Sequence, residues 1–508
     1  MIVAVLLACV LSCESARILG FIPTPSYSHN IVVQPIWKEL SLRGHQITVL
    51  TSNPINDPQL TNLTEIDLSF SYKYLSKIVR TVDKDEIFNN GQLLLANVLN
   101  AQLRYPPVRA LIKNKNETFD LVIVESSRYA ALAFAHRFRC PSVGITVVDA
   151  TPTLHSLLGN PTHPLLYPDT WVNLEGSQTL LDRLWWFLSD VKLSWFQTRT
   201  LLPFNDAIVR EHFGNDYPPV ADLAKDISIQ LTHTDPIFHT VRPLGPATVQ
   251  IGDGLHRLQQ QALPNDLQEV LDVADQGVIY FSLGSYAQSK HLAPKTLRII
   301  LETFAELPYT VIWKFESDQL PNRTSNVVIA KWLPQISVLS HRNVKLFISH
   351  GGLQSVNEAI HANVPLVGLP IFADQHHNVQ RMVSRGCALS LKWERLEKTE
   401  FKRAILKVIG NSKYRDRIAE LAELAKDQPM TGLERAVWWI EYVLRHRGAK
   451  HLRSPAANVP FYQYYLLDVF SLLVLFLVAP MFVLVCITRT ILHFLFHGCA
   501  KHTQTKLD

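Results

Sequence analysis

Polar residues between Phe347 and Gln375 have the types and the spacing that bind a nucleotide joined to a sugar. An apolar run ends at His350-Gly351-Gly352, and a helical stretch with Ser355 and Glu358 in its first turns follows. A glycine turn that leads into a helix leaves N–H groups unpaired at the positive end of the helix dipole, which favours a diphosphate. Glu358 can accept hydrogen bonds from ribose hydroxyls, and Asp374-Gln375, after a second apolar run, can bind a sugar. The segment therefore predicts a nucleotide-sugar site.

The same segment resembles the signature of the UDP-glycosyltransferases. The similarity extends from Arg17 to about Arg453, and the stretches Lys331–Gln335 and Arg435–Trp439 resemble the membrane-bound animal branch, most of all its invertebrate and insect members. The resemblance implies an α/β protein with the GT-B fold, in which two Rossmann-like doubly wound domains face each other across a cleft. It also implies that a UDP-sugar is a co-substrate.

By this resemblance, one set of residues binds the UDP-sugar. Trp332 stacks on the uracil ring, Gln335 bonds the base or the ribose, and Glu358 bonds the ribose. His350, the glycine turn and the residues after it contact the diphosphate, although the family often has Asn where this chain has Gln354. The complete expected set is Ser285, Trp332, Gln335, His350, Gly352, Gln354, Ser355, Glu358, Asp374 and Gln375.

His29 is the candidate catalytic base. The triplet Ser28-His29-Asn30 is expected in the loop after a first strand, at the start of a first helix, and ligands of open α/β sheets bind at the carboxyl ends of the strands. Histidine titrates near neutral pH and can take the proton of an acceptor hydroxyl. By itself such a residue is more often a capping or surface histidine, but the family has its catalytic histidine at this position.

Glu125 is the candidate partner of His29. It follows the apolar run Leu121–Val124, where the family usually has Asp, and a carboxylate there could orient the imidazole and stabilise the imidazolium. Asp120 precedes the same run and is expected at the opposite edge of the sheet. The alternative is that Glu125 is a solvated loop residue and that His29 works alone or through water.

No metal or other cofactor is expected. Asp83-Lys84-Asp85 has the Asp-x-Asp pattern of metal-dependent glycosyltransferases, but it lies in a charged run, which is typical of a solvated surface. The chain has no GxGxxG turn for a nicotinamide dinucleotide and no GxSxG turn for a serine hydrolase. The helix dipole, the backbone amides and His350 can stabilise the negative charge of UDP as it leaves.

Strands that alternate with helices predict the two domains. Short apolar runs bounded by polar residues indicate buried parallel strands at 18–22, 47–50, 121–124 and 143–148, and again at 278–283, 310–314, 327–330 and 344–348. We expect an acceptor-binding domain at 17–245, a Pro- and Gly-rich linker at 246–276 and a UDP-sugar-binding domain at 277–455. The Trp- and Pro-rich region 150–220, with the amphipathic stretch 180–201, is expected to shape the acceptor site.

The two ends of the chain predict a membrane protein of the endoplasmic reticulum. Residues 1–16 resemble a secretory signal peptide, and residues 466–488 are long and apolar enough for a transmembrane helix, with 489–508 as a cytosolic tail. The alternative for the second segment is a buried core helix. The sequons at Asn62, Asn116 and Asn322 agree with a lumenal body and a single-pass type I topology.

The bulk properties exclude other classes. A net charge of +5 over 508 residues, with scattered Lys and Arg, does not suggest nucleic-acid binding. Only Cys140 and Cys387 fall in the two domains, which predicts neither a disulfide framework nor a CxxC metal site.

The sequence as a whole predicts an inverting hexosyltransferase, with glucose as the favoured sugar. Its acceptor would be a small lipophilic compound such as a phenol, steroid or other xenobiotic, and its product a β-glycoside. The alternative is a catalytically impaired membrane protein that binds lipophiles or nucleotides, which Glu125 in place of Asp would support. The sequence is compatible with a homo-oligomer and does not identify the acceptor.

Overall fold

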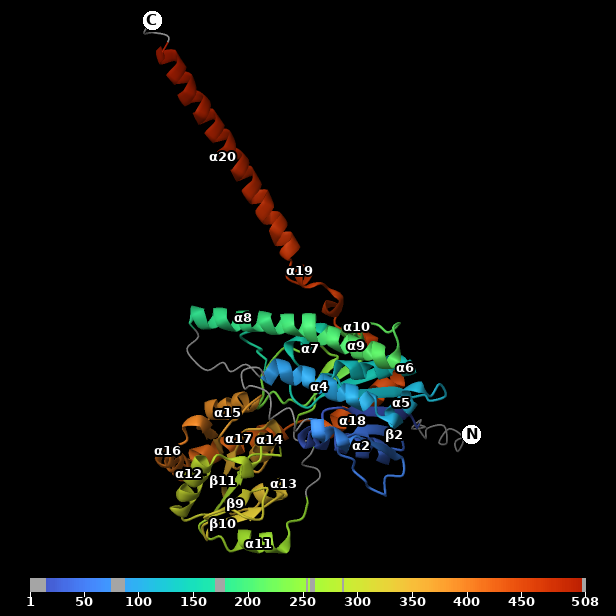
Figure 1. Ribbon diagram of the computed structural model, residues 1–508, viewed down its shortest axis with the longest axis vertical. Helices are drawn as coiled ribbons and strands as arrows, with labels where there is room; N and C mark the ends of the chain where they lie inside the picture. The colour runs from blue at the N-terminus through green and yellow to red at the C-terminus, as the bar shows by residue number, and fades with distance from the viewer. Residues whose placement is uncertain are drawn as a thin grey trace. The chain divides into compact units, whose positions relative to one another are not determined.

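Two parallel β-sheets organise the protein (Figure 1). The computed structural model describes residues 15–74, 87–169, 179–252, 255, 261–285 and 287–504. The chain divides into two compact units, Met1–Ser454, which we call the body, and Pro455–Asp508. The first sheet and the helices around it form the N-terminal lobe of the body, and the second sheet and its helices form the C-terminal lobe.

The first sheet has seven parallel strands in the order β3-β2-β1-β4-β5-β6-β7. Its strands are β1 (Arg17–Ile22), β2 (Gln46–Thr51), β3 (Leu63–Asp67), β4 (Leu121–Glu125), β5 (Ser142–Thr146), β6 (Ile229–Thr232) and β7 (Thr248–Gln250). The helices of this lobe are α2 (Tyr27–Leu42), α4 (Ile87–Leu103), α5 (Pro106–Lys113), α6 (Ala133–Phe138), α7 (Pro152–Leu157), α8 (Leu180–Phe196), α9 (Leu202–Phe213), α10 (Val220–Lys225) and α18 (Gly432–His446).

The second sheet has six parallel strands in the order β10-β9-β8-β11-β12-β13. Its strands are β8 (Val278–Ser282), β9 (Thr310–Lys314), β10 (Val327–Ala330), β11 (Val344–Ser349), β12 (Leu366–Gly368) and β13 (Ala388–Ser390). Its helices are α11 (Asn265–Asp272), α12 (Pro294–Ala305), α13 (Gln335–Leu339), α14 (Leu353–His361), α15 (Gln375–Ser384), α16 (Lys398–Ile409) and α17 (Lys413–Lys426).

The central strands of both sheets are buried on both faces, which explains why they are apolar runs without alternation. Along β4, Leu121 and Ile123 enter one hydrophobic cluster, and Val122 and Val124 enter the cluster on the other face. The strands predicted at 18–22, 121–124, 278–283 and 344–348 form within two residues of the expected bounds. The expected GT-B architecture of two doubly wound sheets is present.

The chain returns to the N-terminal lobe after completing the C-terminal one. Ala436, Val437, Ile440 and Val443 of α18 are buried in the same cluster as β1 and α2. The expected domain ending at residue 455 therefore does not describe where α18 packs. The expected linker 246–276 likewise contains β7, which pairs with β6, and α11, whose Leu267 and Leu271 lie in the C-terminal core.

The first helix begins earlier than predicted. We expected Ser28-His29-Asn30 in the loop that leads into the first helix, but α2 begins at Tyr27, and the N–H of His29 donates to the carbonyl of Ser26. The side chain of Asn30 is buried and donates to the carbonyls of Thr24 and Ser26. These bonds fix the turn between β1 and α2, so His29 lies on the first turn of the helix.

One helix among the described residues is long and apolar enough to cross a membrane. It covers Leu467–Phe494 within α20 (Leu467–Gln504), follows the short helix α19 (Phe461–Tyr464), and none of it is buried within the protein. It contains the predicted span 466–488 almost entirely. Most of the predicted signal peptide, the charged run 83–86 with Asp83-Lys84-Asp85, and the last residues of the predicted tail lie outside the described residues.

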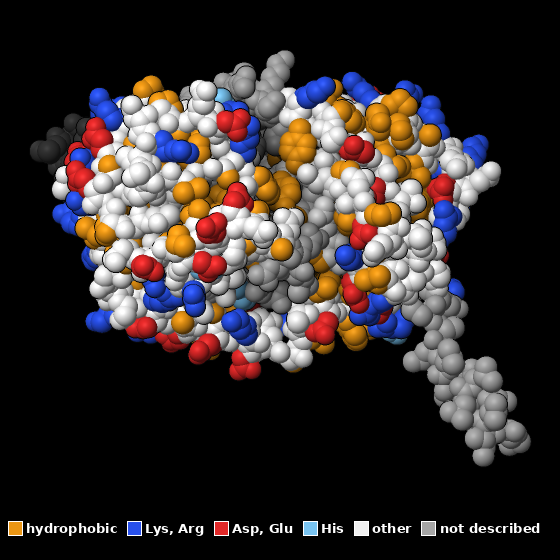
Figure 2. Space-filling view, turned by 90° about the horizontal axis from the view of Figure 1, so that it is seen from below, with side chains coloured by type: hydrophobic (Ala, Val, Ile, Leu, Met, Phe, Trp, Pro, Cys, Tyr) orange, Lys and Arg blue, Asp and Glu red, His pale blue; other side chains and the backbone are white. Residues whose placement is uncertain are grey.

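Figure 2 shows Lys and Arg side chains interspersed with Asp and Glu on one face of the body. Cys140 and Cys387 are free thiols, and burial raises the pKa of Cys387 to about 11. Of the sequons, Asn116 and Asn322 are exposed and Asn62 is half-buried.

Candidate active site

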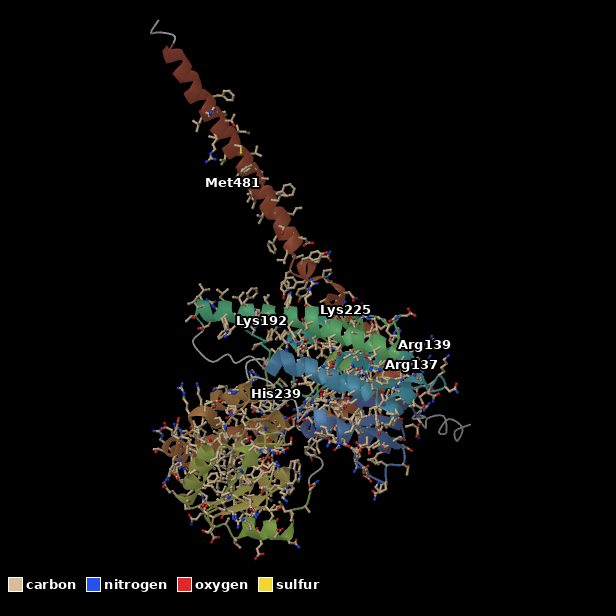
Figure 3. The ribbon with its side chains drawn as sticks, in the orientation of Figure 1. Arg137, Arg139, Lys192, Lys225, His239 and Met481 are labelled. Atoms are coloured by element: carbon tan, nitrogen blue, oxygen red, sulfur yellow. The ribbon has the colours of Figure 1, made fainter. Side chains whose placement is uncertain are left out.

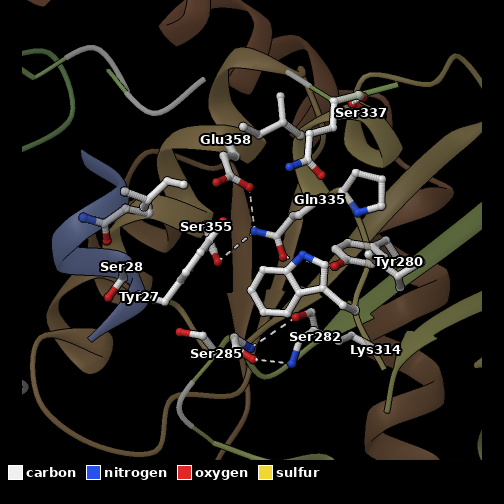
Figure 4. A pocket seen from close by; sticks show the side chains of 18 residues that line it. Tyr27, Ser28, Tyr280, Ser282, Ser285, Lys314, Gln335, Ser337, Ser355 and Glu358 are labelled. Carbon is white, nitrogen blue, oxygen red and sulfur yellow. Dashed lines mark hydrogen bonds between the residues drawn. The ribbon is translucent and has the colours of Figure 1, made fainter. Parts of the chain in front are cut away.

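Two adjoining cavities between the lobes contain every predicted site residue. The first, the Trp332 cavity, also holds Tyr27, Tyr280, Lys314 and Gln335. The second, the His29 cavity, holds Glu125, His350 and Asp374. Ser28, Gly284, Ser285, Gln354 and Ser355 line both, so the two cavities can accommodate one extended ligand. In Figure 4, Tyr27 and Ser28 from α2 face Gln335, Glu358 and Ser355 of the C-terminal lobe.

His29 and Glu125 are in direct contact. Nδ1 of His29 lies 3.0 Å from Oε1 of Glu125, although the two residues are 96 positions apart in the sequence. The parallel pairing of β1 and β4 brings the ends of these strands together. Glu125 is almost fully buried, whereas a quarter of the His29 side chain is exposed. Because an ionised carboxylate only accepts hydrogen bonds, Nδ1 donates the proton of this contact, and Nε2 is the ring nitrogen left to face an acceptor.

The surroundings of Glu125 keep it ionised. Burial by itself raises the pKa of the carboxyl, but His29, Arg128 and Thr24 outweigh burial and hold the pKa at about 2. Thr24 donates from both its N–H and its hydroxyl, and Nε of Arg128 lies 3.8 Å from Oε1. Asp120, at the other end of β4, instead accepts from the N–H of Arg17. The alternative of a solvated Glu125 is thus wrong for this structure.

The Trp332 cavity presents an exposed aromatic ring. Trp332 follows β10, and 51% of its side chain is exposed. Tyr27 of α2 packs edge-on against it with ring centroids 5.0 Å apart, and Nζ of Lys314 lies 5.5 Å from the ring centre. Contacts from both lobes orient the ring, and its exposure leaves surface available for a flat base.

Gln335 joins three other residues of this cavity. Its amide group donates to Ser355 at 3.0 Å and to Glu358 at 2.6 Å, and its carbonyl accepts from the hydroxyl of Tyr280 at 3.1 Å (Figure 4). Gln335 therefore orients Glu358, the predicted ribose ligand, besides lining the cavity itself.

His350 is held between two glycines. A Cβ on Gly284 would lie 2.5 Å from Cε1 of His350, and a Cβ on Gly352 would lie 2.5 Å from Nε2. Gly284 also has a φ of +81°, which favours glycine. Burial and the ammonium of Lys314 lower the pKa of His350 to about 4, so the ring is neutral at physiological pH and can offer one N–H to a phosphate oxygen.

The N-terminus of α14 borders the His29 cavity. Its first residues follow the turn Gly351-Gly352, where Gly351 has a φ of +82°. Gln354 reaches across the cleft, because its amide donates to the carbonyl of Val147 in the N-terminal lobe at 3.4 Å. Ser285 is exposed at the other side of the shared wall. The free amides of this helix end suit a diphosphate.

Asp374 and Gln375 lie at the far end of the His29 cavity. Asp374 precedes α15 and accepts from the amide of Asn378 at 2.7 Å, and burial raises the pKa of its carboxyl. Gln375 is the first residue of α15, and its side-chain carbonyl accepts from the N–H groups of Ile371 and Phe372. Its amide N–H groups are thus the part of Gln375 that could bind a sugar hydroxyl.

Sequence reasoning missed Arg128, Lys314 and Tyr27. Lys314 ends β9, is buried, and donates to the carbonyl of Gly284 at 2.9 Å and to Glu316 at 2.8 Å. Arg128 is buried three residues after Glu125. Lys314 is the last residue of a predicted strand and Arg128 lies just beyond the end of another, and this position at the carboxyl ends of strands could have identified them.

Comparison with known proteins decides the family. The family model described as UDP-glucoronosyl and UDP-glucosyl transferase matches residues 18–505. The chain belongs to the UDP-glycosyltransferases. Among its relatives, UDP-glucosyltransferase 2 of Dactylopius coccus is 33% identical over 94% of this chain and 94% of its own. Ecdysteroid UDP-glucosyltransferase of Spodoptera littoralis nuclear polyhedrosis virus is also 33% identical, over 89% of this chain and 93% of its own.

A solved structure agrees on the fold. The glycosyltransferase of kitacinnamycin superposes with a TM-score of 0.57 at 17% identity, over 84% of this chain and 99% of that one. This UDP-glycosyltransferase is therefore an enzyme of GT-B fold that transfers a sugar from a UDP-sugar to an acceptor. Family membership favours an enzyme over the alternative of a binding protein without activity. Its C-terminal apolar helix is consistent with a membrane anchor.

Proposed function

We propose that this UDP-glycosyltransferase transfers glucose, with inversion, to a hydroxyl of a small lipophilic acceptor, and that His29 is the base. Nε2 of His29 takes the proton of the acceptor hydroxyl, and the oxygen attacks the anomeric carbon on the face opposite UDP. The bond from that carbon to UDP breaks, which gives a β-glucoside, UDP and a protonated histidine. The observation that carries the proposal is the 3.0 Å contact between His29 and the ionised Glu125 in the cavity that also holds His350 and Asp374.

Glu125 stabilises the positive charge that His29 acquires. The carboxylate is already ionised and anchored by Thr24, so it does not have to reorganise when the imidazolium forms. Arg128 is a positioning residue, since its contact is with Glu125.

The donor extends through both cavities in this proposal. Uracil stacks on Trp332, the ribose bonds Glu358, and the diphosphate meets His350, Gly352, Gln354, Ser355, Ser285 and the amides of α14. The sugar hydroxyls reach Asp374 and Gln375. No metal ion is required, because these N–H and hydroxyl groups meet the charge of departing UDP.

Two relatives support glucose and a lipophilic acceptor. Both are named as UDP-glucosyltransferases, and one is named for an ecdysteroid. A membrane anchor suits acceptors that dissolve in lipid. We place the enzyme in the endoplasmic reticulum membrane with its body in the lumen, where sequons such as Asn116 would be glycosylated.

The test uses membranes that contain the full chain. We would supply 1-naphthol with UDP-glucose, UDP-glucuronate, UDP-galactose or UDP-xylose and identify the products by mass. We expect a glucoside both with and without EDTA. The His29→Ala enzyme should form no glucoside, but it should still bind UDP because the UDP site lies in the other lobe. A different product sugar, dependence on a metal, or an active His29→Ala would each contradict one part of the proposal.

A further inference from the structure

Helix α8 turns an apolar face away from the body. Leu181, Trp185 and Trp195 have 75%, 69% and 63% of their surfaces exposed. At about 100° per residue they share one arc of the helix with five more exposed apolar residues. These are Leu180, Leu184, Phe187, Leu188 and Val191, and we call the eight together the α8 face.

The opposite side of α8 is the more polar one. Trp186 and Phe196 are buried against the lobe, but Asp182, Ser189 and Asp190 are half-buried on the same side. This is the reverse of a surface helix in a water-soluble protein, which turns its polar side outward. A contiguous apolar surface of this kind marks an interaction site.

The composition of the α8 face fits the interface of a lipid bilayer. It combines Leu, Phe and two Trp residues with the exposed cation Lys192 (Figure 3), whereas Asp182 and Asp190 lie outside the apolar arc, the latter beside Arg183. Helices that lie in the plane of a membrane have this pattern, with Trp at the headgroup level and the stems of Lys and Arg reaching toward water.

The apolar span of the same chain would tether the body to a bilayer. The body ends at Ser454 and the apolar span begins at Leu467, so only residues 455–466 connect them. A connection of that length spans roughly 40 Å when fully extended, which keeps the body close to any membrane that the span crosses. Tethering raises the effective concentration of lipid around the body, so a weak interfacial affinity is sufficient.

The connection of α8 to the body is rigid enough to transmit this attachment. A π-helical turn at Gln197–Leu201 continues it into α9, where Leu202, Ile208 and Val209 are buried in the core of the N-terminal lobe. A bilayer that holds α8 therefore holds the acceptor-binding lobe as well.

We propose that the α8 face docks into the membrane interface as a second attachment of the enzyme. The inference rests on the membrane anchoring proposed above. Docking would bring the acceptor-binding lobe to the depth at which lipophilic acceptors are dissolved.

Photolabelling from the lipid tests this proposal. The full chain would be reconstituted into phosphatidylcholine–phosphatidylserine vesicles that contain a phospholipid with a diazirine near the top of one acyl chain. After illumination, labelled peptides are mapped by mass spectrometry. We expect label on α8 and on α20, and none on α17, which carries the exposed Leu424 in the C-terminal lobe.

Matched variants sharpen the result. Leu184→Glu, Leu188→Glu and Trp195→Glu together should reduce the α8 label several-fold. Although 180–201 was expected to shape the acceptor site, these three side chains are exposed and line neither cavity, so activity on a water-soluble acceptor should not fall. Leu424→Glu should change nothing.

Two outcomes would overturn the proposal. Label on α20 without label on α8 would support the membrane anchor and contradict docking of the α8 face. A dimer in detergent that the triple variant dissociates would then identify a second copy of the chain as the occupant of that face. Absence of label from α20 would overturn the anchoring itself.

Discussion

At the scale of the single residue, the way in which Glu125 is held offsets the extra length of its side chain. It is one methylene longer than the Asp usual in the family, yet its Oε1 still lies 3.0 Å from Nδ1 of His29 because two donors of Thr24 hold the carboxylate. Replacing Glu125 by Gln should keep the shape but remove the charge that stabilises the imidazolium. We expect kcat to fall at least about tenfold, with little change in UDP binding.

Asp120→Asn is the matched control for that variant, because Asp120 lies at the opposite end of the same strand and bonds Arg17. Its kcat should equal that of the unchanged enzyme. A Glu125→Gln enzyme as active as Asp120→Asn would show that His29 works without a carboxylate partner.

Trp332 offers a second test at the same scale. The ring is half exposed, so Trp332→Ala costs the fold little and removes the predicted stacking surface for uracil. We expect the KM for the UDP-sugar to rise about tenfold, equivalent to about 1.4 kcal/mol, with kcat less affected. Trp438→Ala is the control, since Trp438 is similarly exposed on α18 and lines neither cavity. An unchanged KM in Trp332→Ala would show that uracil does not stack on Trp332 in this cavity.

His350 links the site to the pH dependence of stability. Its pKa falls from 6.5 to about 4 on folding, so the unfolded chain binds the proton more readily. The stabilisation is complete above pH 6.5 and is lost as the pH falls through 4, by up to about 3 kcal/mol. Thermal unfolding between pH 7 and 4 should therefore show a steeper loss of Tm than in His350→Asn. Parallel profiles for the two proteins would mean that His350 is not buried as described.

At the scale of the element, the turn before α14 determines the position of His350. Gly352 has φ −60° and ψ 142°, which alanine adopts without strain, so Gly352→Ala acts only through its Cβ, 2.5 Å from the imidazole. We expect the ring to be displaced and kcat to fall about 100-fold, as small displacements at a reacting site do. Activity and UDP binding measure the effect.

Gly91→Ala is the control for the added methyl group. Gly91 lies within α4, no atom lies within 4 Å of the new Cβ, and alanine favours a helix by up to about 1 kcal/mol. Its activity and Tm should be equal or higher. Equal activities of the two variants would show that the close approach of Gly352 to the His350 ring has no catalytic consequence.

At the scale of the whole molecule, α18 makes the N-terminal lobe depend on the end of the chain. Val437, Ile440 and Val443 each contribute about 1.5–3 kcal/mol by burial, which together approaches the total stability of a typical domain. In detergent, a chain that ends after Met430 should therefore aggregate, whereas one that ends after Ser454 should fold and bind UDP. Size-exclusion chromatography and Tm distinguish them, and a folded, UDP-binding chain ending at Met430 would contradict the role of α18.

Much of this enzyme could be predicted from the sequence because the decisive features are local. Apolar runs bounded by polar residues define strands that are buried on both faces, and β1, β4, β8 and β11 form close to where they were expected. The glycine turn, helix and acidic residue of the donor site lie within one strand–helix–strand unit, so their spacing along the chain fixes their spacing in space. The long apolar segment near the C-terminus is likewise a matter of composition.

Tertiary structure decided what depends on packing between distant segments. The contact between His29 and Glu125 joins residues 96 positions apart. Helix α18 packs against the first sheet although the whole C-terminal lobe lies between them in the sequence. Periodicity marked 180–201 as amphipathic, but the side of α8 that faces outward follows from what packs beneath it. The family resemblance named Glu125 as the partner of His29, but local patterns alone could not establish these contacts, because a parallel sheet brings strand ends together regardless of the chain length between them.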